Sequence, residues 1–424
     1  MDLDGTLIKT DTLIESLLIL FKKQPLILLL LPLWFMQGLP KFKNKVINIA
    51  MPDPELLPYR QAVIDYVKKE KESGRKVILA TATPLEIAES VADYLGFFDE
   101  IIATTTGKNL KGEEKLKAIR QNEHCANGFD YIGDSSADIP VWEGADKALM
   151  VNPNSKIKRK VNSNGNAGEI FESRKNSLKL LIKEIRVYQW AKNILIFVPL
   201  IMAHRFMELP LLFDAFRAFL AFSFVASSVY VTNDLLDMEA DRMHPRKMYR
   251  PLASGELSII TGILAAIVLF LGGLAIAIFT LPVKFIIALL AYIVLTTAYS
   301  FILKRIYIAD IIVLAGLYTL RLISGAFAVP VPLTPWFLEF SMFLFMSLAI
   351  VKRYTELLVV SNQNKKKAKG RGYIIDDMKI LISIGPASGY LAVLVFGLYI
   401  HSGENAALYD TPEILWAIVP FLLY

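Results

Sequence analysis

The chain has 424 residues, of which 54% are hydrophobic and 20% charged, with a formal net charge of +6. It is too apolar for an ordinary soluble protein and too charged to lie in a membrane throughout, so we expect at least two units. The basic residues cluster beside apolar segments, a pattern of membrane proteins that argues against nucleic-acid binding. The single cysteine, Cys125, excludes an intrachain disulfide framework and agrees with a reducing cytosolic face.

The first part of the chain is expected to begin with a strand end and loop at residues 2–7, followed by a mostly helical insertion to about residue 70. Within this insertion the apolar run 26–36 contains Pro32 and is too short for a confident membrane span. We favour its burial in the core of the insertion, with a helical hairpin or a position on the membrane surface as the alternatives.

Short apolar runs then predict strands at 76–80, 100–103, 129–132 and 148–151, with an amphipathic helix at 84–95. Strands that alternate with helices indicate an α/β domain with a parallel sheet. The polar, basic, Gly- and Asn-rich stretch 152–175 is typical of a linker. We therefore expect a first domain at 1–155, with the insertion at about 9–70 as its cap, and a basic linker at 156–178.

The remaining residues, 179–424, are expected to form an all-α membrane domain. Residues 176–189 predict a basic amphipathic helix on an anionic leaflet. Eight apolar spans follow, at roughly 191–204, 211–232, 258–280, 283–302, 307–328, 334–351, 380–401 and 413–424. The last is too short to cross a bilayer, and no strand precedes Asp2, so both ends look incomplete.

The loops between these spans differ in charge. Those on the N-terminal side are rich in lysine and arginine, including the lysines at 365–369, whereas the opposite loops carry only Arg205 and Lys284. The positive-inside rule therefore predicts a multi-pass membrane protein whose N-terminal domain lies in the cytoplasm.

Four polar motifs follow predicted strands or lie in loops of the first domain: DLDGT at 2–6, Thr81, Lys115, and GDSSAD at 133–138. Phosphoryl transfer needs a nucleophile, groups that neutralise the phosphate charge, and a metal held by oxygen ligands. Asp2 is a candidate nucleophile that forms an aspartyl-phosphate, and Asp4 a candidate acid and base. Thr81 and Lys115 are candidates for holding phosphate oxygens. The candidate Mg²⁺ ligands are Asp2, Asp4, Asp134 and Asp138.

At these motifs the chain resembles the haloacid-dehalogenase superfamily of aspartate-nucleophile phosphatases, over about residues 2–155. The resemblance implies a Rossmann-like domain in which the helical insertion forms a cap over the site. Two features depart from that family: the strand that normally carries the nucleophile is missing before Asp2, and the cap is unusually apolar, which suits a lipid-linked phosphate.

The second span ends in the acidic sequence NDLLDMEADR at 233–242. On a helix, Asp234, Asp237 and Asp241 stand at i, i+3 and i+7, and Asn233 lies four residues before Asp237, so all four share one face. Carboxylates crowded on one face repel each other unless a divalent cation lies between them. A solvated helix end with incidental acids is the alternative.

Basic residues follow the acids, among them Arg242, Lys247 and Arg250. An acidic group followed by a basic one suits a Mg²⁺-diphosphate, because the bases neutralise the charge of the leaving group. We therefore predict that the three aspartates are catalytic and bind the metal, and that Asn233 and the three basic residues bind substrate.

A second polar cluster begins at Tyr299 and Lys304 and continues to Asp310 at the start of a span. Lys304 alone is also explained as an ordinary basic flank. Asp310 is costly there without a partner or a metal, so we predict it as a metal ligand. Arg321, deeper in the same span, needs an acidic partner or a substrate phosphate, whereas the small residues after it also suit helix packing.

At NDLLDMEADR and YSFILKR the chain resembles the UbiA-type membrane transferase superfamily, over about residues 180–424. The resemblance implies a bundle of nine spans with a cytoplasm-facing cavity, in which Asp-rich loops bind Mg²⁺ and the donor diphosphate. The second motif departs from the prenyltransferase pattern, because only Asp310 stands where several aspartates are usual. Together with RVYQWAKN at 186–193 and KRYTEL at 352–357, this is similar to the polyprenyl-phosphate phosphoribosyltransferase branch.

That branch implies phosphoribosyl diphosphate as donor and a polyprenyl phosphate as acceptor. The residues expected to hold their phosphates and sugar are Lys192, Asn193, Tyr299, Lys304 and Lys352. The fused phosphatase would then remove the 5-phosphate of the product. Two alternatives stay open: transfer of a polyprenyl group from its diphosphate to an aromatic acceptor, and a degenerate phosphatase domain that serves as a scaffold.

Overall fold

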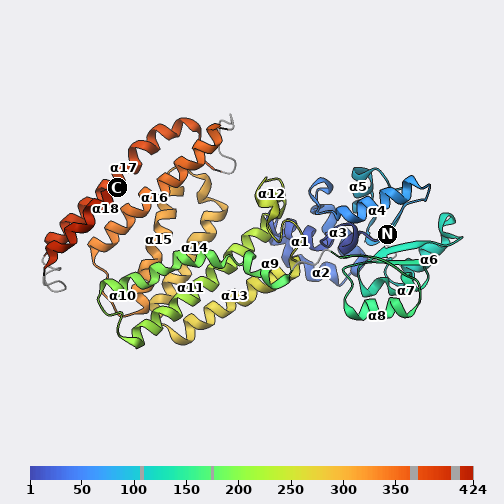
Figure 1. The fold of residues 1–424 in the computed structure, drawn as a ribbon, viewed down its shortest axis with the longest axis horizontal. Coiled ribbons are helices and arrows are strands. Elements are labelled where there is room, and N and C mark those ends of the chain that lie inside the picture. Colours follow the sequence, from blue (N-terminus) through green and yellow to red (C-terminus); the bar gives the residue numbers. More distant parts are fainter. Residues whose placement is uncertain (106–108, 173–175, 363–370, 403–410, 424) are drawn as a thin grey trace. The chain divides into compact units, whose positions relative to one another are not determined.

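The computed structural model describes residues 1–105, 109–172, 176–362, 371–402 and 411–423, without the side chains of 28, 412, 413, 421 and 423 (Figure 1). The lysines expected at 365–369 lie outside the described residues. The chain divides into two compact units. The first comprises Met1–Glu184 and Val231–Leu264, and the second Ile185–Tyr230 and Ala265–Tyr424.

Parallel strands form the centre of the first unit. β1 (Ile78–Pro84) pairs with β2 (Glu100–Thr104), and β3 (Asp130–Gly133) pairs with β4 (Lys147–Val151), which pairs with β5 (Ala167–Phe171). The helices between and beside them are α4 (Gln61–Glu72), α5 (Leu85–Leu95), α6 (Glu113–Gln121), α7 (Ile139–Glu143) and α8 (Ser155–Ser163). Apolar side chains of β1 and β4, such as Leu79 and Leu149, pack with Val63 of α4 and Val91 of α5. The predicted α/β domain with parallel sheets is confirmed.

The predicted linker is wrong for most of its length. Residues 155–171 form α8 and β5, and β5 adds a third strand to the sheet beside β4. Asn154 caps α8 by accepting a hydrogen bond from the backbone N–H of Ile157. Ile157 and Val161, one helical turn apart, are buried while the lysines between them face outward. Two apolar residues at the right spacing thus attach a strongly basic helix to the core.

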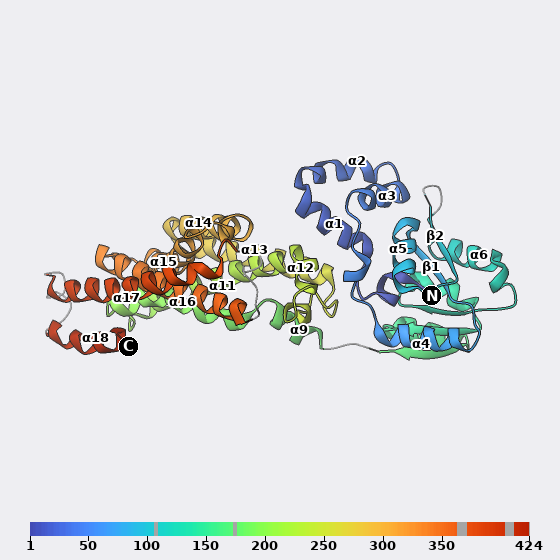
Figure 2. The ribbon, with the colours of Figure 1, turned by 90° about the horizontal axis from the view of Figure 1, so that it is seen from above.

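The insertion before α4 is mostly helical, as predicted, with α1 (Thr12–Lys23), α2 (Leu31–Phe35) and α3 (Leu39–Ile49) gathered in one group (Figure 2). The favoured burial of the apolar run 26–36 is wrong, since Leu26 is 80% and Met36 83% exposed. The three short helices enclose a small core of Ile19, Leu20 and Ala50, against which Ile27, Leu31 and Trp34 of the run pack while half-buried. The small core leaves the remaining large side chains of the run, among them Leu29 and Leu33, mostly exposed.

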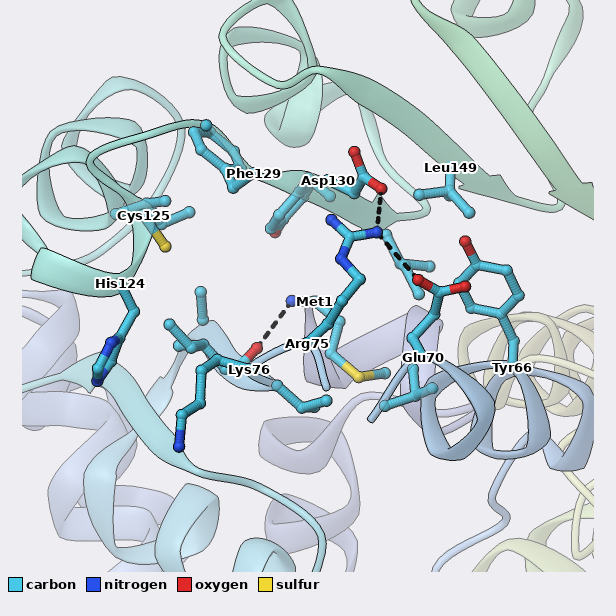
Figure 3. A pocket seen from close by; sticks show the side chains of 18 residues that line it. Met1, Tyr66, Glu70, Arg75, Lys76, His124, Cys125, Phe129, Asp130 and Leu149 are labelled. Atoms are coloured by element: carbon cyan, nitrogen blue, oxygen red, sulfur yellow. Dashed lines mark hydrogen bonds and ion pairs between the residues drawn. The ribbon is translucent and has the colours of Figure 1, made fainter. Parts of the chain in front are cut away.

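Met1 and Asp2 bridge the two sheets. The carbonyl of Met1 accepts from Ala80 in β1, and the N–H of Asp2 donates to Ile132 in β3, at 2.8 and 2.9 Å. The amino group of Met1 donates to the carbonyl of Ile78, and burial lowers its pKa to about 6. Beside this bridge a cavity of about 270 Å³ lies between the edges of β1 and β3 (Figure 3).

Long helices dominate the rest of the chain. They are η6 (Val187–Phe197) continuing into α10 (Val198–Met202), α11 (Leu209–Leu236), α13 (Ile259–Thr280), α14 (Val283–Phe301), α15 (Ala309–Ala328), α16 (Pro335–Asn362), α17 (Met378–His401), and η11 (Pro412–Ile418) continuing into α18 (Val419–Leu423). Within the described residues, five helices are long and apolar enough to cross a membrane. The helical membrane domain is confirmed, whereas the number of eight spans stays a prediction.

Small residues let α15 approach η6 closely. A Cβ added to Gly325 would lie 2.1 Å from the carbonyl oxygen of Ile196, so only glycine fits there. Ser324 and Ala326 beside it are buried as well. The small residues after Arg321 therefore serve helix packing, one of the two interpretations the sequence left open.

Candidate functional sites

The loop that carries the predicted nucleophile is shaped by Gly5. In η1 (Leu3–Leu7) the backbone leaves helical geometry at Asp4 and Gly5, and Gly5 has a φ of 71°. A Cβ there would lie 2.3 Å from Oδ2 of Asp134. Glycine thus supplies both the left-handed backbone and the room that brings this loop against the residues after β3.

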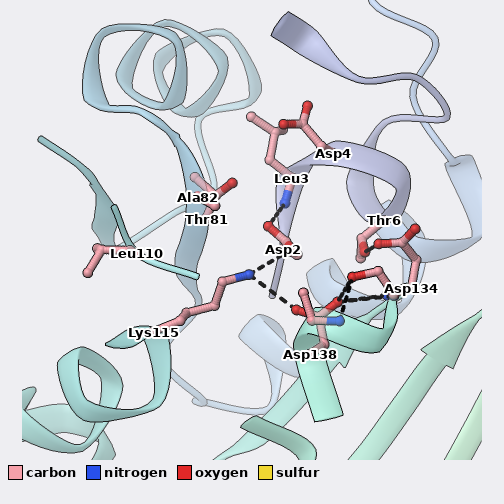
Figure 4. A network of polar contacts seen from close by, with 12 residues as sticks. Asp2, Leu3, Asp4, Thr6, Thr81, Ala82, Leu110, Lys115, Asp134 and Asp138 are labelled. Atoms are coloured by element: carbon pink, nitrogen blue, oxygen red, sulfur yellow. Dashed lines mark hydrogen bonds and ion pairs between the residues drawn. The ribbon is translucent and has the colours of Figure 1, made fainter. Parts of the chain in front are cut away.

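Three predicted metal ligands come together at this point. Carboxylate oxygens of Asp2, Asp134 and Asp138 lie within 4.8 Å of one another, the one acidic group of this kind in the described part of the chain (Figure 4). Lys115 donates to Asp2 at 2.7 Å and to Asp138 at 3.2 Å. The sequence prediction that these four residues meet is thus supported by the geometry.

The electrostatics of the group suit a divalent cation. Burial, aided by the charges of Asp138 and Asp2, raises the pKa of Asp134 to about 7. Burial also raises the pKa of Asp2, although Lys115 opposes it. A cation among these oxygens would relieve the repulsion, and carboxylates are the ligands that Mg²⁺ prefers.

Asp4 is held beside this group by threonines. It accepts hydrogen bonds from Thr83 Oγ1 at 2.6 Å and from the N–H of Thr12 at 2.8 Å. Burial, with a contribution from Asp11, raises its pKa to about 7. A carboxyl group with such a pKa can donate a proton and later accept one near neutral pH, the role predicted for Asp4. Its own carboxylate is not among the grouped oxygens, so its part in metal binding stays a prediction.

A cavity of about 340 Å³ opens over these residues, lined among others by Asp2, Asp4, Thr81 and Lys115. Thr81 itself is buried and donates to Thr83 Oγ1 at 3.0 Å. Three lysines that were not predicted from the sequence also line the cavity: Lys9, Lys43 and Lys111. Nothing in the local sequence marks them, because only the folded cap and loops bring them to the site.

The acidic motif of the membrane domain lies where α11 ends and α12 (Met238–Arg242) begins. Backbone hydrogen bonds from Asp237 to Asn233 and from Asp241 to Asp237 keep the helical spacing across the break. Asp234 and Asp241 are buried and converge on one guanidinium nitrogen of Arg250, 2.8 Å from Asp234. Asp237 instead accepts from Lys22 at 2.7 Å.

Other predicted residues of this motif have partners too. Arg242 donates to both carboxylate oxygens of Glu15, at 2.8 and 2.7 Å, and to the carbonyl of Ala253. The exposed Lys247 lies 3.6 Å from Asp241. Asn233 is half-buried. Glu15 and Lys22, which hold motif residues, were not predicted, since they lie more than 200 residues away in sequence.

In the second unit Asp310 has arginine partners. This fully buried carboxylate is bonded to Arg353 and, at 3.0 Å, to Arg371. Tyr299 accepts from the same two guanidinium groups, at 3.0 and 2.9 Å. These ion pairs offset the cost of burying Asp310, so the metal role predicted for it stays a prediction with a competing explanation.

Arg321 is enclosed by aromatic rings. The guanidinium carbon lies 5.2 Å from the ring centroid of Tyr292 and 5.3 Å from that of Tyr318. Its Nε donates to Oδ1 of Asn193 at 2.9 Å. Ring faces and an amide, rather than a carboxylate, therefore accommodate this charge in the described structure.

The lysines predicted to hold substrate phosphates are placed as follows. Lys192 is half-buried, donates to Gln189 at 2.9 Å, and lies within electrostatic range of Lys352 and Arg321. Lys352 is exposed, and Lys304 is half-buried in η8 (Leu303–Arg305). The second unit thus gathers Lys192, Lys352 and Arg321, three cations that would attract an anion.

Comparison with known proteins identifies both parts. Residues 194–413, just over half of the chain, match the model of the UbiA prenyltransferase family. The chain belongs to the UbiA prenyltransferase family. Residues 33–143 match the model of haloacid dehalogenase-like hydrolases. The predicted fusion of a haloacid dehalogenase-like domain with a UbiA-type transferase domain is confirmed.

Several relatives are similar over one or both parts. The uncharacterized protein y4nM of Sinorhizobium fredii is 35% identical over 98% of this chain and 80% of its own length. Nodulation protein NoeC of Azorhizobium caulinodans is 38% identical over 52% of this chain and 71% of its own. Decaprenyl-phosphate phosphoribosyltransferase of Mycobacterium tuberculosis is 35% identical over 42% of this chain and 60% of its own. A UbiA homolog from Archaeoglobus fulgidus bound to GPP and Mg²⁺ has a TM-score of 0.45 at 17% identity, covering 57% of this chain and 83% of that one.

Proposed function

We propose that the membrane domain transfers a phosphoribosyl group from phosphoribosyl diphosphate to a polyprenyl phosphate. The observation that carries this proposal is the convergence of Asp234 and Asp241 on Arg250 at the end of an apolar helix long enough to cross a membrane. The similarity to decaprenyl-phosphate phosphoribosyltransferase supports these substrates.

The residues of the acidic motif and Arg250 would have different roles in the transfer. Asp234 and Asp241 would hold Mg²⁺, because burial raises the pKa of Asp241 even beside Arg250 and a cation would favour its charged form. Bound there, the metal would supply Lewis-acid polarisation of the donor diphosphate. Arg250 would neutralise the diphosphate as the ribosyl C1–O bond breaks. An oxygen of the lipid phosphate forms the new bond to C1, and diphosphate departs.

The acceptor phosphate suits the cations of the second unit. Lys352 and Arg321 both lie within electrostatic range of Lys192, so a phosphate beside Lys192 would be attracted by more than one cation. We propose this group as the lipid phosphate site. The positive-inside bias of the loops supports a cytoplasmic position for the N-terminal domain.

The haloacid dehalogenase-like domain would then remove the 5-phosphate of the lipid-linked product. Asp2, which accepts a hydrogen bond from Lys115, would act as the nucleophile, and Asp4, which accepts one from Thr83, would act as the proton donor. Thr81 and Lys115 would hold the transferred phosphoryl group, and Asp2, Asp134 and Asp138 would hold Mg²⁺. The exposed apolar run of the cap suits a substrate that carries a lipid.

A doubly labelled donor tests both steps at once. Full-length protein in detergent with Mg²⁺ and a polyprenyl phosphate receives phosphoribosyl diphosphate labelled with ¹⁴C in the ribose and ³²P in the 5-phosphate. We expect ¹⁴C in the lipid phase without ³²P for the native chain, both labels for Asp2→Asn, and neither for Asp234→Asn.

The matched control is Asp214→Asn, on the same helix α11 but in an exposed pair with Arg217. It should behave as the native chain. Product formed only from a polyprenyl diphosphate and an aromatic acceptor would replace the proposal with prenyl transfer. If the lipid product made by the native chain retains all of its ³²P, the first domain does not remove the 5-phosphate and the scaffold alternative is favoured.

A further inference from the structure

The cap contributes a cation to the phosphatase cavity that the proposed chemistry leaves unused. Lys43 of α3 is half-buried, lines the cavity, and donates to the carbonyl oxygen of Ala82 at 2.8 Å. Among the described residues it belongs to no ion pair, and Asp4 exerts the largest charge effect on it. Lys43 therefore stands on the side of the cavity where Asp4, the proton donor, meets the leaving group.

A second lysine widens the positive region. Lys111, in the loop before α6, lines the same cavity and is exposed. It is close enough to Lys43 for their charges to interact. The transferred phosphoryl group already has Lys115 and the metal ligands. Lys43, which lies near Asp4, and its neighbour Lys111 are therefore available to the alcohol that leaves rather than to the phosphoryl group that is transferred.

We propose that Lys43 and Lys111 bind a second phosphate on the leaving alcohol, so that the domain selects sugar phosphates that also carry a phosphodiester. This deepens the proposed function and rests on it, because a ribosyl 5-phosphate joined to a lipid through a phosphodiester has these two groups. A hydrogen bond to a charged group contributes roughly ten- to hundredfold in binding, enough for selection.

The chemical step is balanced without further reactants. A carboxylate oxygen of Asp2 bonds to phosphorus, the bond from phosphorus to O5 of the ribose breaks, and Asp4 gives its proton to O5. Water, losing a proton to Asp4, then attacks the aspartyl-phosphate and releases inorganic phosphate. The diester held by Lys43 and Lys111 stays intact throughout.

Two matched esters test the selection: methyl ribofuranoside 5-phosphate, and ribofuranosyl 1-(methyl phosphate) 5-phosphate, which differ only in the phosphodiester. Full-length protein in detergent with Mg²⁺ should show kcat/KM at least about tenfold higher for the diester-bearing compound. Lys43→Met should abolish most of this preference, Lys111→Met part of it, and Lys43→Arg should keep it.

The control is Lys41→Met, which removes an exposed lysine from the same helix that does not line the cavity and should keep the native preference. A native chain without preference overturns the proposal. So does a Lys43→Met chain that loses activity equally on both esters, because Lys43 would then only fasten the cap to Ala82.

Calorimetric binding of both esters to Asp2→Asn separates this proposal from the phosphatase function. If binding shows a Lys43-dependent preference but the native chain releases no phosphate, the proposed recognition of the phosphodiester stands and the proposed phosphatase function is wrong. If the native chain releases phosphate but neither rate nor binding shows a Lys43-dependent preference, only the proposed recognition of the phosphodiester is wrong.

Discussion

The ammonium nitrogen of Lys115 lies 2.7 Å from Oδ2 of Asp2, and both side chains are almost fully buried. This ion pair ties α6 to the second residue of the chain. It also holds the nucleophile in one orientation, with Asp138 as a second acceptor of the same ammonium group.

Lys115→Met should abolish phosphate release and destabilise the first domain. Removing one partner of a buried ion pair costs about 3–5 kcal/mol, since the remaining carboxylates keep their desolvation without compensation. Thermal unfolding in detergent and phosphate release measure the two effects. Lys117→Met, on the same helix in an exposed pair with Glu114, should change neither. Full activity of Lys115→Met would show that the pair does not position Asp2.

Asp4→Asn should impair hydrolysis in proportion to the basicity of the leaving group. An alkyl phosphate needs the proton of Asp4, so its turnover should fall by about 10²–10⁴-fold. The aryl ester p-nitrophenyl phosphate leaves without protonation and should still phosphorylate Asp2, giving a burst of nitrophenol before a slow steady state. If rapid mixing shows that the rate of the first step, phosphorylation of Asp2, falls equally for both esters, the result would argue against Asp4 as the proton donor.

Asp234→Asn and Asp241→Asn should each reduce transfer to the lipid by at least about 100-fold, as expected when electrostatic stabilisation of the transition state is lost. Each removes one of the two buried carboxylates that converge on Arg250. Stabilisation of the protein by added Mg²⁺ should weaken in parallel, because a ligand is lost. Both variants are compared in a chain that also carries Asp2→Asn, so that the phosphatase site does not contribute to the stabilisation by Mg²⁺. Unchanged transfer would place the donor site elsewhere.

Arg353→Met should lower the unfolding temperature, because it removes one of the two arginines that are hydrogen-bonded to the fully buried Asp310 and leaves Arg371. The double variant Asp310→Asn with Arg353→Met should unfold at a higher temperature than the single one, since it buries no uncompensated charge. Arg305→Met, at an exposed position, is the control. A double variant less stable than Arg353→Met would show that Asp310 has another role, such as metal binding.

Local patterns predicted much of the first domain. The apolar runs at 100–103, 129–132 and 148–151 correspond to β2, β3 and β4 within one or two residues. The meeting of Asp2 with Asp134 was also predictable, because loops at the carboxyl ends of neighbouring parallel strands lie at one edge of a sheet.

Contacts between distant segments were not predictable in the same way. Lys43 reaches Ala82, and Arg242 reaches Glu15, only because the cap folds as it does. A lysine on an amphipathic helix and an arginine after acidic residues have ordinary local explanations, so nothing in the sequence distinguishes them. The exposure of the run 26–36 escaped prediction for a related reason: hydrophobicity indicates a tendency to be buried, but the available partners decide whether it is.

Leu26, Leu33, Phe35 and Met36 form an exposed apolar patch that affects how this protein should be purified. In a fragment that ends near residue 184 this patch would be exposed to water, where such patches promote self-association. Fragments that carry Leu26→Ser and Met36→Ser should stay monodisperse at concentrations where the native fragment aggregates. The two domains are thus best purified together, in detergent micelles that cover the apolar patch.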